Sequence, residues 1–308
     1  MKLSKLWDSL ARTKFAKIDE VFLDTFREPG NANNRLAAWD PFDSSMRYFK
    51  FLFFHQVQSK DDRFFSGYAR IGNTSLGRPV TLKSPSGLDL NLDHFFSIEE
   101  YTFLSTNLDF TEIERVVEIG AGFGRTAQAL IKLVGNVRQY AIIDIPEVLE
   151  LSRAYLKMVL TKAEFAKLVF VNALTLNDHI HECEFRTPDL IINIDSFQEM
   201  PQETIRYYLD KLITDARFFY SKNPIGKYRP ESVGLSGVNE DQLMDVFSLG
   251  LSTDVIDIFN EGELVAARLK HIQQYRPSEL FDVIATEPLG IFPYYLNVLY
   301  QKALPKSG

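Results

Sequence analysis

The chain has 308 residues, of which 45% are hydrophobic and 24% are charged, a composition typical of folded globular proteins. Its formal net charge is -7 and its pI is about 5.4, which disfavours binding to the phosphate backbone of nucleic acids. Cys183 is the only cysteine, so no disulfide can form within the chain. The sequence lacks an apolar stretch of about eighteen residues, and we therefore expect no transmembrane helix and a cytoplasmic protein.

Residues 1–110 contain no glycine-rich loop, and we predict a mainly helical, aromatic-rich cap or acceptor region for them. Residues 1–20 have the spacing of an amphipathic helix, which we interpret as packing on its own domain or on a second copy of the chain rather than on a membrane. Residues 37–57 carry many aromatic side chains and predict buried helices. Residues 67–87 predict a loop or hairpin, and residues 95–108 predict a helix that leads into a second region, 111–308.

The segment VVEIGAGFGR at 116–125 predicts a strand, a glycine loop and the start of a helix. Glu118 is followed by Gly120, Gly122 and Gly124, and apolar residues then recur at helical spacing up to residue 134. Such a loop places a ligand at the carboxyl end of the first strand of an open α/β sheet. In a dinucleotide fingerprint a third glycine would stand where this chain has Arg125. The spacing instead resembles the first motif of class I S-adenosyl-L-methionine (SAM)-dependent methyltransferases.

A second strand is predicted at 140–144, ending in Asp144, with Pro146 at the first position of a helix over 147–160. An acid at this place can accept hydrogen bonds from both hydroxyls of a ribose. Asp is also a favoured N-cap, and the two roles are compatible. Asp144 therefore favours a nucleoside ligand without choosing between NAD and SAM.

The remaining pattern predicts an α/β fold. Apolar strands are expected at 168–171, 189–194 and 217–220, with a helix at 201–214. Near-continuous apolar strands that alternate with helices indicate a mostly parallel sheet covered on both faces. Two further strands at 281–287 and 294–301 predict a terminal hairpin with an antiparallel last strand, and helices at 240–249 and 261–275 form an insertion before it.

Five segments of the chain resemble the bacterial sugar O-methyltransferases found with polysaccharide and glycoside biosynthesis. They are VVEIGAGFGR (116–125), AIIDIPE (141–147), NIDSFQEMP (193–201), YSKNP (220–224) and FPYYLNVLY (292–300). The first two are generic to SAM enzymes, and the third and fifth suggest the sugar family. The resemblance implies a Rossmann-like class I methyltransferase fold, SAM as cofactor with S-adenosyl-L-homocysteine (SAH) as product, and a sugar, nucleotide-sugar or glycan as acceptor. A homodimer is a further possible assembly.

The resemblance also implies site residues. Those expected at the cofactor are Glu118, Gly120, Gly122, Gly124, Arg125, Asp144, Ile145, Asn172, Ala173 and Asp195. Arg125 can meet the carboxylate of the methionine moiety of SAM or simply form a surface salt bridge. Lys222 and Asn223 are expected beside the acceptor, although Asn223-Pro224 can equally start a turn.

Methyl transfer to a sugar hydroxyl is helped by a base that takes its proton. The candidate catalytic residues are Glu199, Asp195 and His94, with His55 as a further histidine that can reach down from the cap. Glu199 can equally be a carboxylate at the start of a helix. We expect no metal, although Asp195 and Glu199 are carboxylates of the kind that hold Mg²⁺, and we interpret the cluster at 178–183 as a polar loop.

Three other functions remain open at this point. They are methylation of another small-molecule hydroxyl, an NAD-dependent oxidoreductase, and a degenerate SAM-fold partner protein without activity. Arg125 disfavours the oxidoreductase, and the intact set of Glu118, three glycines and Asp144 disfavours the degenerate protein.

Overall fold

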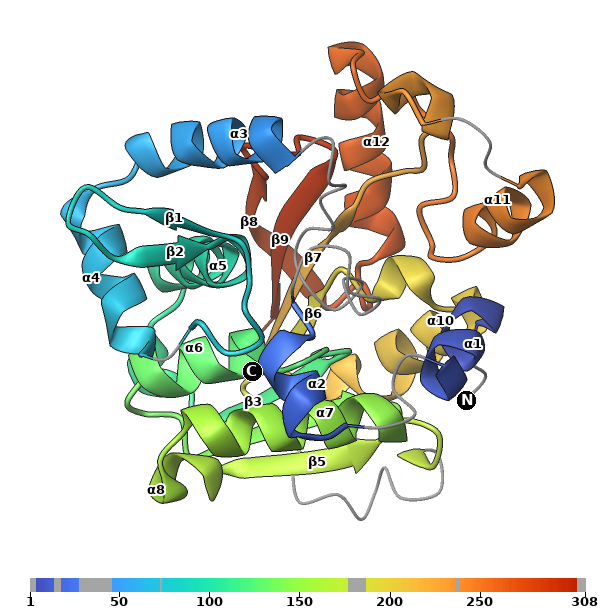
Figure 1. Ribbon diagram of the computed structural model, residues 1–308. Helices are drawn as coiled ribbons and strands as arrows, with labels where there is room; N and C mark the ends of the chain where they lie inside the picture. Colours follow the sequence, from blue (N-terminus) through green and yellow to red (C-terminus); the bar gives the residue numbers. More distant parts are fainter. Residues whose placement is uncertain are drawn as a thin grey trace. The chain divides into compact units, whose positions relative to one another are not determined.

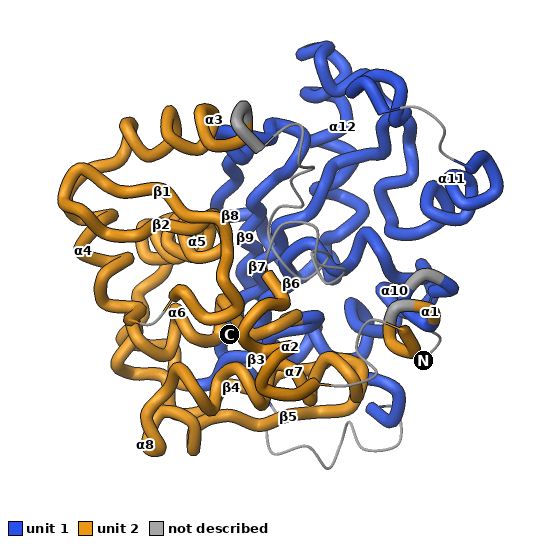
Figure 2. The backbone as a smooth tube through the Cα atoms, viewed as in Figure 1, with its two compact units in different colours: residues 1–8, 115–120, 173–308 blue, residues 9–114, 121–172 orange. Residues whose placement is uncertain are grey.

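A computed structural model of the chain describes residues 4–13, 18–27, 46–72, 74–176, 187–235 and 239–303. The chain divides into two compact units, which Figure 2 colours separately. Unit 1 comprises residues 1–8, 115–120 and 173–308, and unit 2 comprises residues 9–114 and 121–172. The boundary predicted at residue 110 stays a prediction.

The described residues of unit 1 form five strands in the order β3-β6-β7-β9-β8 (Figure 1). They are β3 (Arg115–Ile119), β6 (Leu190–Ile194), β7 (Phe218–Pro224), β9 (Tyr295–Lys302) and β8 (Phe281–Pro288). β3, β6 and β7 are parallel, and β9 runs antiparallel to both β7 and β8. All five residues of β6 are buried, as expected for a parallel strand covered on both faces.

The helices of unit 1 follow these strands. The short η4 (Phe197–Glu199) and then α10 (Gln202–Lys211) and η5 (Ile213–Asp215) lie between β6 and β7. η6 (Pro230–Val233), α11 (Glu240–Phe247) and α12 (Glu261–Gln274) lie between β7 and β8. The side-chain oxygens of Asn239 and Asn260 accept hydrogen bonds from the first turns of α11 and α12, which explains where these two predicted helices begin.

Unit 2 contains the parallel pair β4 (Gln139–Asp144) and β5 (Leu168–Asn172) and the antiparallel hairpin β1 (Thr81–Lys83) and β2 (Asp89–Asn91). Its helices are α2 (Glu20–Thr25), α3 (Met46–Gln58), α4 (Asp62–Ile71), α5 (Leu92–Asn107), η3 (Phe110–Glu112), α6 (Arg125–Leu133), α7 (Pro146–Val159) and α8 (Lys162–Phe165). The helix α1 (Lys5–Thr13) spans the division between the units.

Most predicted elements are confirmed, with differences at their ends. α5 begins before the predicted residue 95 because Asn91 caps it, its Oδ1 accepting from the backbone N–H of His94 at 3.0 Å. The segment 67–87, predicted as a loop or hairpin, contains the end of α4 and the first strand of the antiparallel hairpin β1–β2. In α3 Phe49 and Phe53 are buried while Phe51 and Phe54 are exposed, so the prediction of a buried aromatic helix is correct for one face only. Residues 28–45, which include part of that aromatic stretch, lie outside the described residues.

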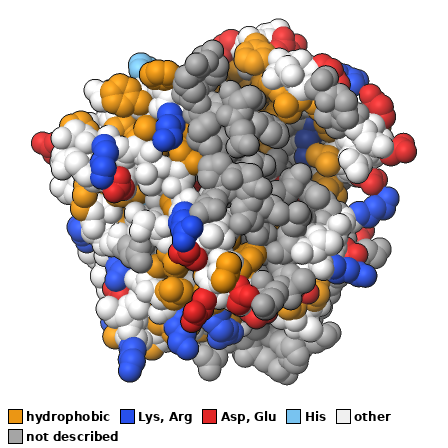
Figure 3. All heavy atoms as spheres, in the orientation of Figure 1, with side chains coloured by type: hydrophobic (Ala, Val, Ile, Leu, Met, Phe, Trp, Pro, Cys, Tyr) orange, Lys and Arg blue, Asp and Glu red, His pale blue; other side chains and the backbone are white. Residues whose placement is uncertain are grey.

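The architecture is the predicted one: an α/β fold of the Rossmann-like methyltransferase kind, with a mostly parallel sheet and an antiparallel C-terminal strand. None of the described helices is long and apolar enough to cross a membrane. On the face shown in Figure 3, the described basic and acidic side chains are interspersed.

Candidate functional site

The glycine loop after β3 has a backbone that only glycine adopts easily. Gly120, Gly122 and Gly124 have φ angles of 72°, 58° and 93°, all in the left-handed region. A Cβ on Gly120 would lie 2.2 Å from Oγ of Ser196, and a Cβ on Gly124 would lie 2.8 Å from Cδ1 of Leu156. The loop therefore requires glycine at 120 and 124 both for its backbone conformation and for the space around it.

Asp144 lies at the end of β4, as predicted. Its Oδ2 accepts from the backbone N–H of Gly122 at 3.2 Å, and its Oδ1 accepts from the backbone N–H of Ile145 at 2.8 Å. The carboxylate is thereby fixed beside the glycine loop. Burial raises the pKa of Asp144 to about 7, although the two backbone hydrogen bonds act in the opposite direction.

Four further residues expected at the cofactor lie at the ends of strands or within them, Asn172 and Ile145 in unit 2 and Glu118 and Ala173 in unit 1. Asn172 ends β5 and pairs with Asp144 across the parallel strands, so both stand at the same carboxyl edge of unit 2. Glu118 is buried in β3, with 2% of its surface exposed. Ile145 is buried after Asp144, and Ala173 is buried after Asn172.

Arg125 begins α6 and forms an ion pair with Glu100 of α5. Its Nη1 and Nη2 donate to the two carboxylate oxygens of Glu100 at 2.7 and 2.9 Å, and Nη1 also donates to Oγ of Ser97 at 3.0 Å. The side chain of Glu100 is buried, so this fork links α6 to α5. The interaction is the salt bridge that the sequence left open as the alternative to a cofactor contact, and it is a buried one.

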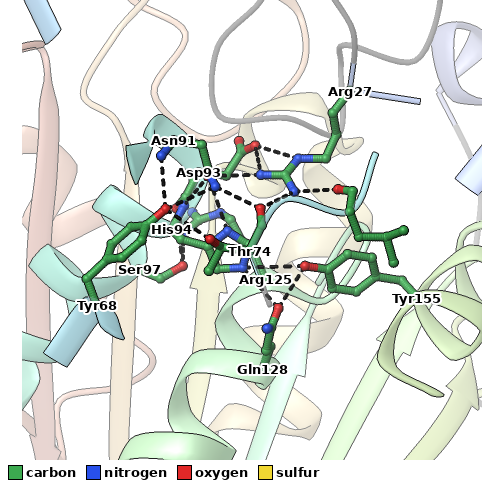
Figure 4. Close-up of polar contacts among 11 residues, drawn as sticks. Arg27, Tyr68, Thr74, Asn91, Asp93, His94, Ser97, Arg125, Gln128 and Tyr155 are labelled. Carbon is green, nitrogen blue, oxygen red and sulfur yellow. Dashed lines mark hydrogen bonds and ion pairs between the residues drawn. The ribbon is translucent and has the colours of Figure 1, made fainter. Parts of the chain in front are cut away.

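His94 lies in a buried polar network of unit 2 (Figure 4). Its Nε2 is 2.9 Å from Oε1 of Gln128, and its Nδ1 is 3.2 Å from Oδ1 of Asn91. Tyr155 donates to the same Gln128 oxygen at 2.7 Å. Burial first, and the charge of Arg27 second, lower the pKa of His94 to about 3. A neutral, enclosed imidazole of this kind is a poor proton acceptor, and we leave it out of the proposed chemistry. His55, the other histidine considered, is exposed on α3.

In unit 1 the turn after β6 holds Asp195 in an uncommon conformation. Its φ angle is 62°, a left-handed value that non-glycine residues adopt mainly where the surrounding structure imposes it. Tyr295 donates its hydroxyl to Oδ1 of Asp195 at 2.7 Å, and the side-chain amide of Gln198 contacts the same oxygen. Burial and the Asp195 charge raise the pKa of Tyr295 far above its ordinary value, so Tyr295 stays a hydrogen-bond donor.

Glu199 ends η4 on the same side of unit 1. The indole Nε1–H of Trp7 donates to Oε2 of Glu199 at 2.7 Å, which fixes the carboxylate. Two further hydrogen bonds hold the turn that follows β6. Ser196 Oγ donates to the carbonyl of Ile119 at 3.1 Å, and the N–H of Gly250 donates to the carbonyl of Met200 at 2.9 Å. The carboxylates of Asp195 and Glu199 are thus presented from a rigid turn.

Lys222 and Asn223, the residues expected beside the acceptor, are buried within β7. Asn223 is 0% exposed, and its Nδ2 donates to Oδ1 of Asn193 at 2.8 Å and to Oγ of Ser221 at 3.0 Å. Asn193 in turn donates to the carbonyl of Ile119 at 3.0 Å. These contacts make Asn223 part of a polar layer that links the parallel strands.

Lys227, which follows β7, is a residue that the sequence did not single out. Its Nζ donates to the backbone carbonyl of Gln198 at 3.1 Å, and 7% of its surface is exposed. Burial lowers the pKa of Lys227 to about 8, while the charges of Glu199 and Asp195 act in the opposite direction. Two carboxylates and one amine therefore lie together just after β6 and β7: those of Asp195, Glu199 and Lys227. No sequence motif marks this lysine, because its burial depends on the turn that it contacts.

No metal site emerges from the part of the chain that the structure describes, where no three His, Cys, Asp or Glu side chains are grouped to hold an ion. The cluster at 178–183 lies outside the described residues.

No known family model matches the sequence, and no curated protein matches it. Solved structures of similar fold include the mitomycin 7-O-methyltransferase MmcR, with 14% identity and a TM-score of 0.42 over 68% of this chain and 57% of that one. The methyltransferase domain of bacterial CtHen1-C has 12% identity and a TM-score of 0.46 over 70% of this chain and 100% of that one. PigF, solved with SAH, has 16% identity and a TM-score of 0.41 over 68% of this chain and 58% of that one.

The chain thus spans little more than half the length of MmcR and PigF. The identities and TM-scores are low, so these likenesses identify neither a cofactor nor an acceptor for this protein.

Proposed function

We propose that this protein is a SAM-dependent O-methyltransferase that acts on a hydroxyl of a sugar or glycan. The observation that carries the proposal is the carboxylate of Asp144, fixed at 3.2 Å from the N–H of Gly122 in a loop of left-handed glycines. Such a loop lets a ligand approach the backbone closely, and the acid beside it suits the two hydroxyls of a ribose.

The residues present fit a nucleoside cofactor. Asp144 is held by backbone N–H groups on one side and retains acceptor capacity for hydroxyl donors. Asn172 stands at the same strand edge and offers an amide for hydrogen bonding to an adenine. When bound, SAM supplies a methyl group that its positively charged sulfur makes electrophilic.

SAM is favoured over NAD by the residue that starts α6. In the dinucleotide fingerprint a glycine at this place permits close packing of helix and strand, whereas here Arg125 occupies it and pairs with Glu100. The chain thus has the glycine loop and the ribose acid without the third fingerprint glycine.

The proposal that the acceptor is a sugar rests on residues of unit 1. Segments 193–201 and 292–300, which suggest the sugar family, are joined there by the hydrogen bond from Tyr295 to Asp195. Carboxylates such as Asp195 and Glu199 accept hydrogen bonds from hydroxyl groups. Tyr294 and Tyr295 have ring centroids 5.0 Å apart, and Tyr228 lies 5.3 Å from Tyr294. Aromatic faces of this kind are apolar surfaces on which the C–H face of a sugar ring can pack.

A direct test incubates the purified protein with methyl-tritiated SAM and a panel of monosaccharides, nucleotide-sugars and phenols. Label on a sugar product supports the proposal, and label on phenols alone would replace the sugar with another small-molecule hydroxyl. The variant Glu199→Gln removes a carboxylate charge while keeping the side chain's size. It should lower turnover and leave SAH affinity unchanged, and normal turnover would remove Glu199 from the acceptor site.

A further inference from the structure

The backbone of Lys227 is held in place by contacts on both sides of its Cα. Its backbone N–H donates to the carbonyl of Asp254 at 2.7 Å, and its carbonyl accepts from the N–H of Ile256 at 2.8 Å. The preceding Gly226 packs so closely that a Cβ there would lie 2.9 Å from the Asp254 carbonyl oxygen. The chain at 226–227 is therefore clamped against residues 254–256, and the side chain extends from a fixed point.

The amine lies at an edge of unit 1 where open α/β sheets bind ligands. β6 and β7 are parallel neighbours, and the turn with Asp195 and Glu199 follows β6 while Lys227 follows β7. Ligands of such sheets bind outside the carboxyl ends of the strands. The contact between Lys227 Nζ and the Gln198 carbonyl puts the amine against the segment that connects the two carboxylates.

We propose that Lys227 is the general base of the reaction, its Nζ accepting the proton of the acceptor hydroxyl. This inference rests on the proposed methyltransferase function. The acceptor oxygen forms its bond to the methyl carbon, the electron pair of the carbon–sulfur bond stays on sulfur, and the hydroxyl proton moves to the neutral amine. Asp195 and Glu199 accept hydrogen bonds from the sugar and stabilise the resulting ammonium.

The amine of Lys227 has a pKa that allows it to act as a base. A lysine in a model peptide has a pKa of about 10.4 and is almost wholly protonated near neutral pH, so it cannot accept a proton. Burial of Lys227 lowers its pKa to about 8, which gives a usable fraction of neutral amine. Glu199 and Asp195 are the charged groups that oppose this shift, and they are themselves held by Trp7 and Tyr295.

The competing explanation is structural: Lys227 would serve only to satisfy the Gln198 carbonyl. Two variants separate the explanations. Lys227→Arg keeps a cationic donor but has no accessible neutral form, and Lys227→Met keeps the apolar stem alone. Lys211→Met, at an exposed position of α10, is the matched control.

The first measurement needs no acceptor and no cofactor. Trace labelling with acetic anhydride across a pH series, read by mass spectrometry, gives the pH at which each lysine becomes half reactive. Lys227 should reach half reactivity at about pH 8. Glu199→Gln should move that midpoint to lower pH, because it removes a charge that raises the pKa. A midpoint near the value of an ordinary lysine, about 10.4, overturns the inference.

The second measurement compares SAH affinity with methyl transfer to a sugar of the panel. Both Lys227 variants should lose about a hundredfold or more in kcat, the usual contribution of general base catalysis, with SAH affinity and the control variant unchanged. Wild-type turnover by Lys227→Arg overturns the inference while leaving the proposed function in place. Failure of the wild-type protein to bind SAH overturns the proposed function, and the inference with it.

Discussion

Asp144 offers the sharpest test of the cofactor assignment. In the variant Asp144→Ala, SAH loses two charge-assisted hydrogen bonds from its ribose hydroxyls, each worth about 1.5–3 kcal/mol. The loss is therefore about 3 kcal/mol or more, which corresponds to a rise in Kd of roughly a hundredfold. Asp144→Asn keeps one side-chain oxygen as an acceptor and should fall between the wild type and Asp144→Ala.

The assay is calorimetric titration with SAH, accompanied by thermal unfolding. Asp144→Ala also removes the acceptor of the Gly122 and Ile145 N–H groups, at a cost to folding of about 1–2 kcal/mol. The variant should therefore remain folded. Asp109→Ala is the control, since it removes an exposed acid that caps η3 in the same unit. An unchanged SAH affinity in folded Asp144→Ala would refute the role of this carboxylate.

Asp144, Gly124 and Glu100 each give a further prediction from their described contacts. Asp144 has a raised pKa of about 7, and hydrogen bonds from ribose hydroxyls need its ionised form. SAH affinity should therefore fall by up to about tenfold per pH unit below pH 7 and level off above it. An SAH affinity that does not change with pH would contradict this prediction. The same shift makes the folded form bind more protons than the unfolded form between about pH 4 and 7, so the Asp144 contribution to stability should decline as pH rises through that window. Gly124→Ala should lower the free energy of unfolding, measured by urea denaturation, by about 1–2 kcal/mol or more, because φ of Gly124 is 93° and a Cβ there would meet Leu156. Gly135→Ala is the control and should change the free energy of unfolding little, because a Cβ there meets nothing within 4 Å. Glu100→Gln should lower the free energy of unfolding by about 3 kcal/mol, since it removes the carboxylate charge that pairs with the largely buried Arg125. A change of a few tenths of a kcal/mol would show that this ion pair is dispensable.

The glycine loop and Asp144 could be predicted from the sequence because their signals are local. Left-handed backbone at 120, 122 and 124 selects glycine directly, and an acid after a short apolar strand stays at the end of that strand. The parallel strands could be predicted for the same reason, since burial on both faces requires continuous apolar residues.

The other site residues depend on contacts between distant segments. His94 and Arg125 are enclosed by Gln128, Asn91 and Glu100, and the sequence does not show which helices meet. β7 extends to Pro224, beyond the predicted residue 220, because its polar end pairs with β9 as far as Tyr295. Lys227 was missed because a lone lysine after a strand has no distinguishing pattern until its surroundings bury it.

The burial of the polar end of β7 is another feature that the sequence did not predict. Lys222 and Asn223 are polar residues near a strand end, and such residues are usually exposed. Here pairing with β6 on one side and β9 on the other encloses them.

The measurement that tests the central claim most directly is calorimetric titration of the wild-type protein with SAH, with NAD and NADP as controls. We predict micromolar binding of SAH and no binding of either dinucleotide. Binding of NAD in place of SAH, or no binding of SAH, would contradict the assignment of the glycine loop to a methyltransferase cofactor.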